Sequence, residues 1–330
     1  VDEADTNLSF FLDWLREFAS RVPVVHVAAW KIGAQHAVPL PENVNVHPMP
    51  KGKLKRIIAL KMLTWKKRKE IDAVFVHMLA PVAATLGLFW RLLGKRVVLW
   101  YTHGSVPNSL RVANVFVNGI CTATSPSMNL RTVKKIVTGH GIDTTRFCPS
   151  DAPRLPELLT VGRITPRKRL ESLIDLVEAV RRVQPSLPLR LRIVGEAYLD
   201  SDKAYAETLQ ADVARRGLQD VVSFDGAKLG DELIELYRRS AVFVTASETG
   251  SLDKAVLEAL SCGTPALAAS RVFAGFEGVH VAANGWDDDA IAFVVSRLAH
   301  PTTDDAARTD VSRKASLKTL ISRLVSILLD

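Results

Sequence analysis

The feature that most constrains the fold is a regular alternation of short apolar strands with longer helices. In the first half, predicted strands at residues 73–77 and 96–101 enclose an apolar helix at 81–93. The second half repeats the pattern, beginning with a strand at 158–161 and a helix at 169–183. Such succession predicts parallel sheets with helices on both faces, which is an α/β architecture.

A Pro-rich segment separates the two halves. Residues 147–156 read FCPSDAPRLP, a composition typical of a connection between compact units. At 330 residues the chain is long enough for two domains that each bury their own core. We therefore expect one domain over residues 1–150, a second over 151–312, and an amphipathic terminal helix within 313–330.

One stretch in the second half, residues 247–265, reads SETGSLDKAVLEALSCGTP. A predicted strand at 241–245 enters a polar turn, and a helix begins near Asp253 and ends before Gly263. Unpaired N–H groups and the positive end of the helix dipole suit such a turn to a diphosphate. Glu258 lies about one and a half turns into the helix, from where it can reach ribose hydroxyls.

A second stretch, residues 158–170, reads LLTVGRITPRKRL. It places Gly162, Arg163 and Lys168 between a strand and a helix. Two fixed cations at this point suit the charge that develops on a leaving diphosphate. An ordinary βα loop with solvated charges explains either stretch alone equally well.

Together the two stretches resemble a known family. GRITPRKRL is similar to the G-R-x-x-x-x-K segment, and SLDKAVLEALSCGTPALA to the E-x7-E segment, of the retaining GT-B glycosyltransferases of family 4. The segments LRIVG, VSFDG and ELIELYRRSAVFVT occur in the family's order. The resemblance covers nearly the whole chain and is strongest over residues 133–269. It implies a GT-B fold, in which two Rossmann-like doubly wound domains face a central cleft.

The resemblance also implies what each domain does. Residues 1–150 would form the acceptor-side domain and 151–312 the nucleotide-sugar-binding domain, with the helix in 313–330 crossing back to the first. In the family, a strand precedes the helix that we predict at 8–21. The first domain is therefore expected to lack its first strand, which would interrupt its sheet in the middle.

The same resemblance assigns roles to individual residues. The catalytic candidates are His103, Arg163 and Lys168. Glu258 would bind the donor ribose, and N–H groups of the turn before it would share the diphosphate. The candidate donor-binding residues are Gly162, Glu196, Gly250, Ser251, Leu252, Asp253, Lys254 and Glu258.

The sequence departs from the family pattern at one position. The first Glu of E-x7-E should stand eight residues before Glu258, where this chain has Gly250. Glu248 is a candidate replacement, and the backbone of Gly250 and Ser251 is another. A branch of the family has TGSLDK at this place, so the change does not imply loss of activity.

Histidines near strand ends are the candidates on the acceptor side. His103 follows the strand at 96–101, at the edge where ligands bind in parallel sheets. In the family, a His in this kind of loop faces the donor sugar; a loop histidine bonded to backbone is the alternative. His77 also ends a strand and ranks second. His140 lies in TGHGIDTTRF, which matches the family's segment before the domain hinge.

The charge of the chain is unevenly distributed. Residues 1–150 hold 20 Lys/Arg and 9 Asp/Glu, a net charge of +11. Residues 151–330 hold 23 Lys/Arg and 26 Asp/Glu, a net charge of −3, so the whole chain has +8. Residues 51–69 hold nine basic side chains and no acidic one, with apolar residues at helical spacing. Such a helix suits an anionic membrane surface, although a solvated basic face explains it equally well. Nucleic acid is disfavoured because no recognition motif accompanies the charge.

Cysteine spacing, apolar runs and acidic clusters limit which cellular compartment and which cofactors the chain can have. Three scattered cysteines show neither metal nor disulfide spacing, and the longest apolar run, 78–90, is too short for a bilayer span of roughly 20 residues. We therefore expect a cytoplasmic protein, and association with the cytoplasmic face of a membrane stays open as one of the two interpretations of residues 51–69. Asp287, Asp288 and Asp289 are interpreted as a helix N-cap and first turn, so no metal site and no cofactor is predicted.

The resulting expectation is a metal-independent hexosyltransferase that moves a sugar from a nucleotide diphosphate-sugar to a saccharide or lipid-linked acceptor. Retention at the anomeric carbon is implied by the resemblance alone. Two alternatives stay open: a GT-B nucleotide-sugar epimerase and a non-catalytic nucleotide-sugar-binding protein. A dehydrogenase is disfavoured because neither half has a strand, GxGxxG and helix in succession.

Overall fold

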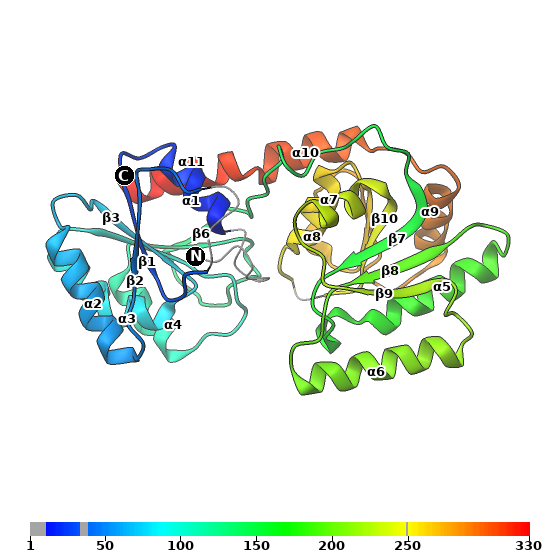
Figure 1. Ribbon diagram of the computed structural model, residues 1–330, viewed down its shortest axis with the longest axis horizontal. Helices are drawn as coiled ribbons and strands as arrows, with labels where there is room; N and C mark the ends of the chain where they lie inside the picture. The colour runs from blue at the N-terminus through cyan, green and yellow to red at the C-terminus, as the bar shows by residue number, and fades with distance from the viewer. Residues whose placement is uncertain (1–10, 34–38, 249) are drawn as a thin grey trace. The chain divides into compact units, whose positions relative to one another are not determined.

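The computed structural model describes residues 11–33, 39–248 and 250–330, and the chain forms two compact units (Figure 1). Unit 1 comprises Val1–Gly141 and Leu317–Asp330, and unit 2 comprises Ile142–Ser316. The divisions predicted from the sequence are 150/151 and 312/313. The first division lies earlier because residues after Ile142 pack on unit 2: Phe147 lies against its core and accepts a 2.5 Å hydrogen bond from Ser261 Oγ.

The strands of unit 1 fall into two parallel sheets. One sheet pairs β1 (Val25–Ala29) with β2 (Val44–Pro48). The other has the order β3 (Ala73–His77), β4 (Arg96–Trp100), β5 (Gly119–Thr122) and β6 (Lys135–Val137). Within the described ranges no strand joins the two sheets.

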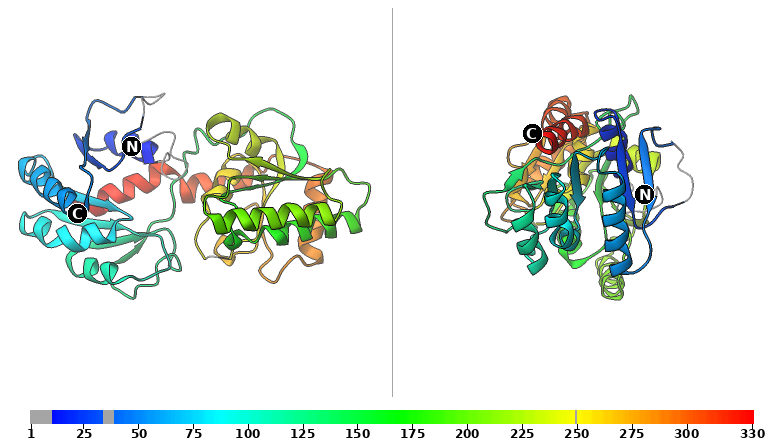
Figure 2. Two further views of the ribbon diagram at one scale, coloured as in Figure 1. Left: turned by 60° about the horizontal axis from the view of Figure 1, so that its bottom comes forward. Right: turned by 90° about the vertical axis from the view of Figure 1, so that its left-hand side faces the viewer.

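Each face of the four-stranded sheet has its own core, because side chains alternate along a strand. Val97 and Leu99 of β4 contribute to one core, and Val98 and Trp100 to the other. The first core is covered by α2 (Lys53–Lys66), α3 (Ala80–Leu92) and α4 (Asn108–Phe116), which lie on one side of the sheet in Figure 2. The second is covered by α1 (Phe11–Ala19) and α11 (Leu317–Leu329).

Unit 2 contains one continuous sheet of six parallel strands in the order β12-β11-β10-β7-β8-β9. The chain begins in the middle of this sheet, builds outward through β8 and β9, and then returns to the other side of β7 with β10. This order has a topological switch point between β7 and β10, where doubly wound sheets bind ligands. The strands are β7 (Leu155–Val161), β8 (Arg190–Val194), β9 (Val222–Gly226), β10 (Ser240–Thr245), β11 (Ala266–Ala268) and β12 (Val279–Val281).

Helices cover both faces of this sheet. Leu158 on β7 points to a core shared with α5, α6 and α9, and Leu159 points to a core shared with α7, α8 and α10. The helices are α5 (Leu170–Val183), α6 (Asp200–Arg215), α7 (Gly230–Arg239), α8 (Lys254–Ser261), α9 (Asp288–Ala299) and α10 (Asp305–Ala315), with short 3-10 turns at Pro166–Lys168 and Arg271–Phe273. The α/β doubly wound prediction is therefore confirmed for the fold.

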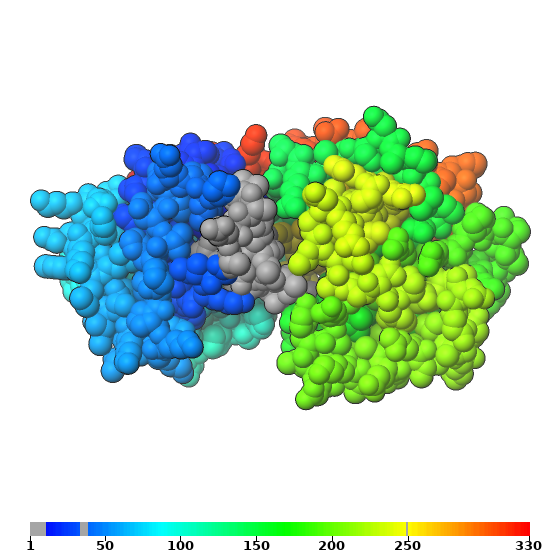
Figure 3. Space-filling model, in the orientation of Figure 1, coloured from blue at the N-terminus to red at the C-terminus, as the bar shows by residue number. Residues whose placement is uncertain are grey.

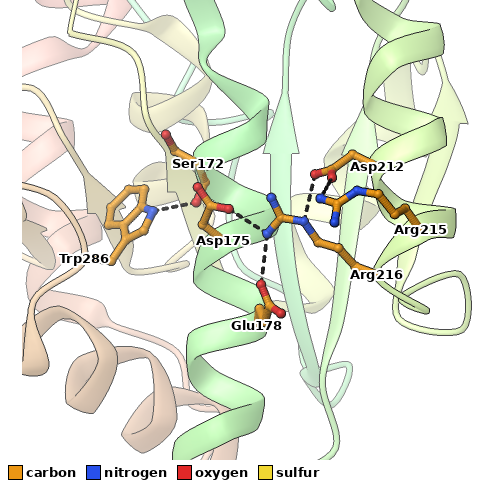
Figure 4. Close-up of polar contacts among 7 residues, drawn as sticks. All are labelled: Ser172, Asp175, Glu178, Asp212, Arg215, Arg216 and Trp286. Atoms are coloured by element: carbon orange, nitrogen blue, oxygen red, sulfur yellow. Dashed lines mark hydrogen bonds and ion pairs between the residues drawn. The ribbon is translucent and has the colours of Figure 1, made fainter.

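A charged contact ties two helices of unit 2 together. Arg216, just after α6, donates from Nη1 to Asp175 at 2.7 Å and to Glu178 at 2.9 Å, and both acceptors lie on α5 (Figure 4). Its hydrogen bonds with Asp212 and with Asp175 raise the pKa of the guanidinium. Arg216 thereby links α6 to α5.

Each unit buries one cysteine completely. Cys121 on β5 lies in the core beneath α11, and Cys262, the C-cap residue of α8, lies in the core that α8 shares with α7 and α10. Burial raises the pKa of each thiol to about 12. The third cysteine, Cys148, is partly exposed.

Candidate functional site

The candidate site lies at the switch point of unit 2. Leu158 and Leu159 of β7 are in register with Val242 and Phe243 of β10, so the carboxyl ends of the two strands are neighbours. The loop after β7 leads into α5, and the loop after β10 leads into α8. Both stretches singled out in the sequence therefore meet at one edge of the sheet.

The backbone at the end of β7 is very closely packed. Gly162 has a φ of 148°, and its N–H donates to the Val194 carbonyl at 2.9 Å. Gly195 has a φ of 146°, and a Cβ atom there would lie 1.9 Å from the Gly162 carbonyl oxygen. A Cβ at Gly162 would lie 2.9 Å from Lys168 Cε. Glycine at both positions allows two loops and the lysine stem to approach one another.

The two loops are joined by an ion pair. Lys168 Nζ contacts the Asp253 carboxylate, although the residues are 85 positions apart. Asp253 is also the N-cap of α8, because its Oδ1 accepts a hydrogen bond from Ala255 N at 3.3 Å. The Lys168 and Asp253 side chains are 23% and 22% exposed, so both remain within reach of a ligand. A cation is thus held at the positive end of a helix.

A second ion pair joins the same two loops nearer the surface. Arg169, which has a left-handed φ of 51°, contacts the Glu248 carboxylate. Glu248 was the candidate replacement for the family's first Glu, and in this structure its partner is the guanidinium. Gly250 has a φ of 68°, a conformation that a glutamate adopts only with strain. This backbone conformation gives a physical reason for glycine at that position.

Glu258 lies on α8 with a partner that the sequence analysis missed. The Tyr237 hydroxyl donates to Glu258 Oε2 at 2.9 Å from α7. Burial raises the pKa of Glu258, while Lys254 and the Tyr237 hydrogen bond oppose the rise. Tyr237 is buried completely, so it holds the carboxylate in one orientation. Only the position of Tyr237 in the periodic segment ELIELYRRS signalled that it faces the core.

The other donor-side candidates are also in unit 2. Arg163 is exposed and forms no ion pair within the described part of the chain. Glu196 is exposed, and its carbonyl accepts a 3.0 Å hydrogen bond from Ile164 N, which keeps it beside the Gly162 loop. Leu252 is buried in the core, so only its backbone faces the turn. Ser251 and Lys254 are partly exposed on either side of the Asp253 cap.

His103 belongs to unit 1, in the loop after β4. Its Nδ1 accepts a 3.1 Å hydrogen bond from Ser105 N and lies 2.7 Å from Ser105 Oγ. Because a backbone N–H is always a donor, the neutral ring carries its proton on Nε2. Asn129 donates to the Gly104 carbonyl at 2.8 Å and fixes the loop. The exposed His103 therefore offers a ring N–H donor at the carboxyl end of β4.

The two remaining histidine candidates, His77 and His140, lie beside aromatic side chains of unit 1. His77 packs against Phe11 and Trp14, with ring centroids 4.8 and 5.8 Å away in tilted and edge-on arrangements, and it helps to pack α1 on the sheet. His140 lies 6.1 Å from the Trp100 ring.

The helix-cap interpretation of the triple aspartate is confirmed. Asp287 caps α9, and its Oδ1 accepts from Ala290 N at 2.9 Å. Across the residues that the structure describes, there is no group of three or more His, Cys, Asp or Glu side chains arranged to hold a metal ion. In the same ranges, none of the helices is both long and apolar enough to cross a membrane.

The region that contains this geometry matches a known family. Residues 144–298 match the family model described as "Glycosyl transferases group 1". The second unit carries the group 1 glycosyltransferase pattern. The resemblance predicted from the sequence is therefore confirmed over the stretch from Gly162 to Glu258, which includes the candidates on both loops.

Curated relatives share this group 1 region. Mannosylfructose-phosphate synthase of Agrobacterium fabrum is 29% identical over 136 residues, which cover 38% of this chain and 30% of the relative. D-inositol 3-phosphate glycosyltransferase of Stackebrandtia nassauensis is 31% identical over 193 residues, which cover 55% of this chain and 42% of the relative. The match therefore spans less than half the length of these relatives.

Solved structures extend the likeness to the whole chain at the level of the fold. Anabaena Alr3699/HepE in complex with UDP superposes with a TM-score of 0.73 and 17% identity, over 99% of this chain and 98% of that one. Sucrose-phosphate synthase of Thermosynechococcus elongatus gives 0.68 and 17%, over 99% and 94%. The GT-B fold expected from the group 1 resemblance is confirmed.

Proposed function

We propose that the chain is a glycosyltransferase of the hexosyltransferase type, which moves a sugar from a nucleotide diphosphate-sugar to a saccharide or lipid-linked acceptor. The observation that carries the proposal is the meeting of Lys168 and Asp253 at the β7/β10 switch point. A cation, a helix N-terminus and a close-packed glycine backbone converge there, and this combination binds diphosphates. Because a structural neighbour binds UDP and UDP-glucose, uridine nucleotides are the first donors to test.

The leaving diphosphate would be stabilised by side chains of the Gly162 loop. A diphosphate oxygen would join or replace the Asp253 carboxylate on the Lys168 ammonium. The exposed Arg163 supplies a second cation on the same loop. Negative charge grows on the diphosphate as the bond to the sugar breaks, and both cations stabilise that charge. With the N–H groups of residues 250–253, they provide charge compensation without a divalent metal, and the family resemblance supports retention.

Glu258 would bind the ribose of the donor. Its carboxylate is oriented by Tyr237, whose hydroxyl already occupies one oxygen at 2.9 Å. The second oxygen remains as an acceptor for a ribose hydroxyl. Glu196 lies beside the Gly162 loop and is a further polar contact for the donor.

The acceptor would bind on unit 1. His103 presents Nε2–H outward while Ser105 holds Nδ1. A neutral donor of this kind can hydrogen-bond a sugar hydroxyl without adding charge. We propose that His103 contacts the transferred sugar or the acceptor.

The test is donor turnover with substitutions in one loop. Lys168→Ala and Arg163→Ala should each lower kcat/KM by about 100- to 1000-fold, the effect of one preorganised charge contact. Arg167→Ala is the matched control, because Arg167 is an exposed cation of the same loop that makes no ion pair among the described residues. Near-normal turnover in both site variants would reject the assigned roles.

A non-catalytic nucleotide-sugar-binding protein is the second candidate, favoured by one observation. Glu248, the nearest carboxylate to the position of the family's first Glu, is engaged by Arg169. Such a protein would bind the donor, as measured by calorimetry, and transfer no sugar to any member of an acceptor panel. Conversion of the donor sugar without an acceptor would instead identify an epimerase.

A further inference from the structure

We propose that the outer surface of the α2, α3 and α4 layer in unit 1 docks on an anionic lipid surface. These helices cover one side of the four-stranded sheet, and their inner faces supply its core. Their outer faces carry apolar side chains that the core does not use. We call this surface the outer helix face, and its apolar members are Leu54, Ile58, Met62, Trp65, Leu88, Leu92, Val112 and Val115.

The apolar side chains of α2 form a narrow stripe. Leu54, Ile58, Met62 and Trp65 follow one another at intervals of four, four and three residues. At roughly 100° per residue they fall within about 80° of the helix circumference. Leu54 is 70% exposed and Trp65 is 54% exposed. The stripe is distinct from the buried face of α2, which is centred on Leu60 and Thr64.

Exposed apolar side chains also lie on the neighbouring helices. Thr64 accepts a 3.1 Å hydrogen bond from Trp90 Nε1, so α2 and α3 pack side by side. On α3, Leu88 and the 78% exposed Leu92 are one turn apart, and on α4 Val112 and Val115 are similarly placed. Figure 2 shows the three helices along one side of unit 1, and the blue area of Figure 3 includes the surface of α2. The exposed apolar surface is thus shared by a whole helical layer.

The charge of this layer has one sign. Within the bounds of α2, α3 and α4 the sequence contains no Asp or Glu. The ion pairs of the described residues involve none of the cations in these helices. Cations without counter-ions around an apolar stripe are complementary to anionic headgroups above acyl chains. The cations are Lys53, Lys55, Arg56, Lys61, Lys66, Arg91 and Arg111.

The first turn of α2 carries positive charge, although the helix dipole disfavours cations at this end. Lys53 and Lys55 lie at the positive end of the helix dipole, with no acidic residue in the first turn. The N-cap is Gly52, which provides no side-chain cap. Basic residues and a glycine cap at the start of an exposed helix weaken that helix. Such residues therefore indicate a function other than helix stability, for example binding to a partner.

Lipid fits these features better than another macromolecule. Lysine stems lie along apolar surface while their ammonium groups reach headgroups, and Trp65 suits the interface between headgroup and acyl chain. Nucleic acid would satisfy the cations and leave the stripe exposed to water. Each lysine near an anionic bilayer strengthens binding by about fivefold.

The experiment uses the full chain with unilamellar vesicles of phosphatidylcholine, with and without 30% phosphatidylserine. We expect co-sedimentation with the anionic vesicles only, and quenching of Trp65 fluorescence by brominated lipids. Lys53→Gln/Lys55→Gln/Lys61→Gln should weaken binding about 100-fold, from three fivefold steps. Leu54→Ser/Ile58→Ser/Trp65→Ser should weaken it at least about tenfold while circular dichroism stays unchanged.

Matched controls come from unit 2, on exposed side chains of the same kinds. Arg181→Gln/Arg182→Gln/Arg190→Gln removes the same charge, and Val183→Ser/Leu199→Ser/Leu229→Ser removes comparable apolar surface. Binding should be retained in both. Equal recovery with neutral vesicles, equal loss in the control variants, self-association through the stripe, or tighter binding to tRNA than to vesicles would each overturn the proposal. Vesicle binding requires no sugar donor, so its outcome is independent of the transferase proposal.

Discussion

The two units share a doubly wound plan and differ in how they use their polar groups. In unit 2, Lys168, Arg169 and Arg216 each contact a carboxylate from another element. In unit 1, the cations of α2 have no carboxylate partner among the described residues. Unit 2 also has one continuous sheet, whereas the strands described in unit 1 form two. Paired charges preorganise a small-molecule site, while unpaired charges leave a surface ready for a large partner.

Among variants that test this difference between the units, Gly195→Ala in unit 2 is expected to have the largest effect on stability and donor binding. The new Cβ would lie 1.9 Å from the Gly162 carbonyl oxygen, at a φ of 146°. We expect a loss of about 3 kcal/mol in the free energy of unfolding and a loss of donor binding. Gly217→Ala is the control, since Gly217 has a φ of 66° and a Cβ added there would meet no other heavy atom within 4 Å. There the loss should be about 1 kcal/mol. Similar losses in urea unfolding of both variants would contradict the close-packing argument.

Glu258→Gln should separate binding from stability within unit 2. Loss of a charged hydrogen bond to ribose should weaken donor affinity by about 1.5–3 kcal/mol, measured by calorimetry. The pKa of Glu258 is raised from its usual 4.5, mainly by burial. Its contribution to stability is therefore complete below pH 4.5 and is lost as the pH rises through the folded-state pKa. Urea unfolding of the Gln variant should show a weaker decline over that pH window; an unchanged pH profile would argue against the burial cause.

Arg216→Ala tests the charged contact between α5 and α6. Asp175 and Glu178 are about half exposed, so solvent screens the ion pairs and the expected loss of unfolding free energy is about 1 kcal/mol. Arg215→Ala is matched, because the 71% exposed Arg215 pairs with Asp212 and with no other carboxylate of the described residues. Its loss should be below about 0.5 kcal/mol. If the two variants unfold at the same urea concentration, Arg216 does not link the helices energetically.

The smallest effect is expected in α2 of unit 1, and its sign is opposite. Lys53→Gln removes a cation from the positive end of the helix and should stabilise α2 by about 0.5 kcal/mol. Lys66→Gln removes one from the negative end and should destabilise it by a similar amount. Amide hydrogen exchange in α2 measures both. We expect slower exchange in the Lys53 variant and faster exchange in the Lys66 variant. If exchange slows in neither variant, or slows in the Lys66 variant, the helix dipole does not determine the stability of α2.

Local signals were sufficient for most elements, although they gave no prediction of α10 (Asp305–Ala315), and they were insufficient for the contacts between elements. The alternation of strands and helices and the turn before Glu258 follow from short-range patterns, and the fold they predicted is confirmed. The pairing of Lys168 with Asp253 joins residues 85 positions apart, and Tyr237 reaches Glu258 from a different helix. The periodicity of the sequence predicts neither contact, because only tertiary packing brings these residues together.

The division between the units shows the same limit. Residues 147–156 have the composition of a linker, yet Phe147 packs against the core of unit 2 and the Cys148 carbonyl accepts a 2.7 Å hydrogen bond from Arg238. Proline content indicated an irregular backbone correctly as far as Arg154, whereas Leu155 and Pro156 already belong to β7. It could not indicate which unit that backbone packs on, because the apolar partners come from distant positions.

The completely buried cysteines provide a direct way to follow each unit. Cys121 and Cys262 are sealed in different cores and keep their protons at neutral pH, so a thiol reagent modifies either one only after its unit opens. In a Cys148→Ala background, the two labelling rates report the opening free energies of unit 1 and unit 2 in one sample. Mass spectrometry of the labelled peptides then distinguishes ligands that protect one unit from ligands that protect both.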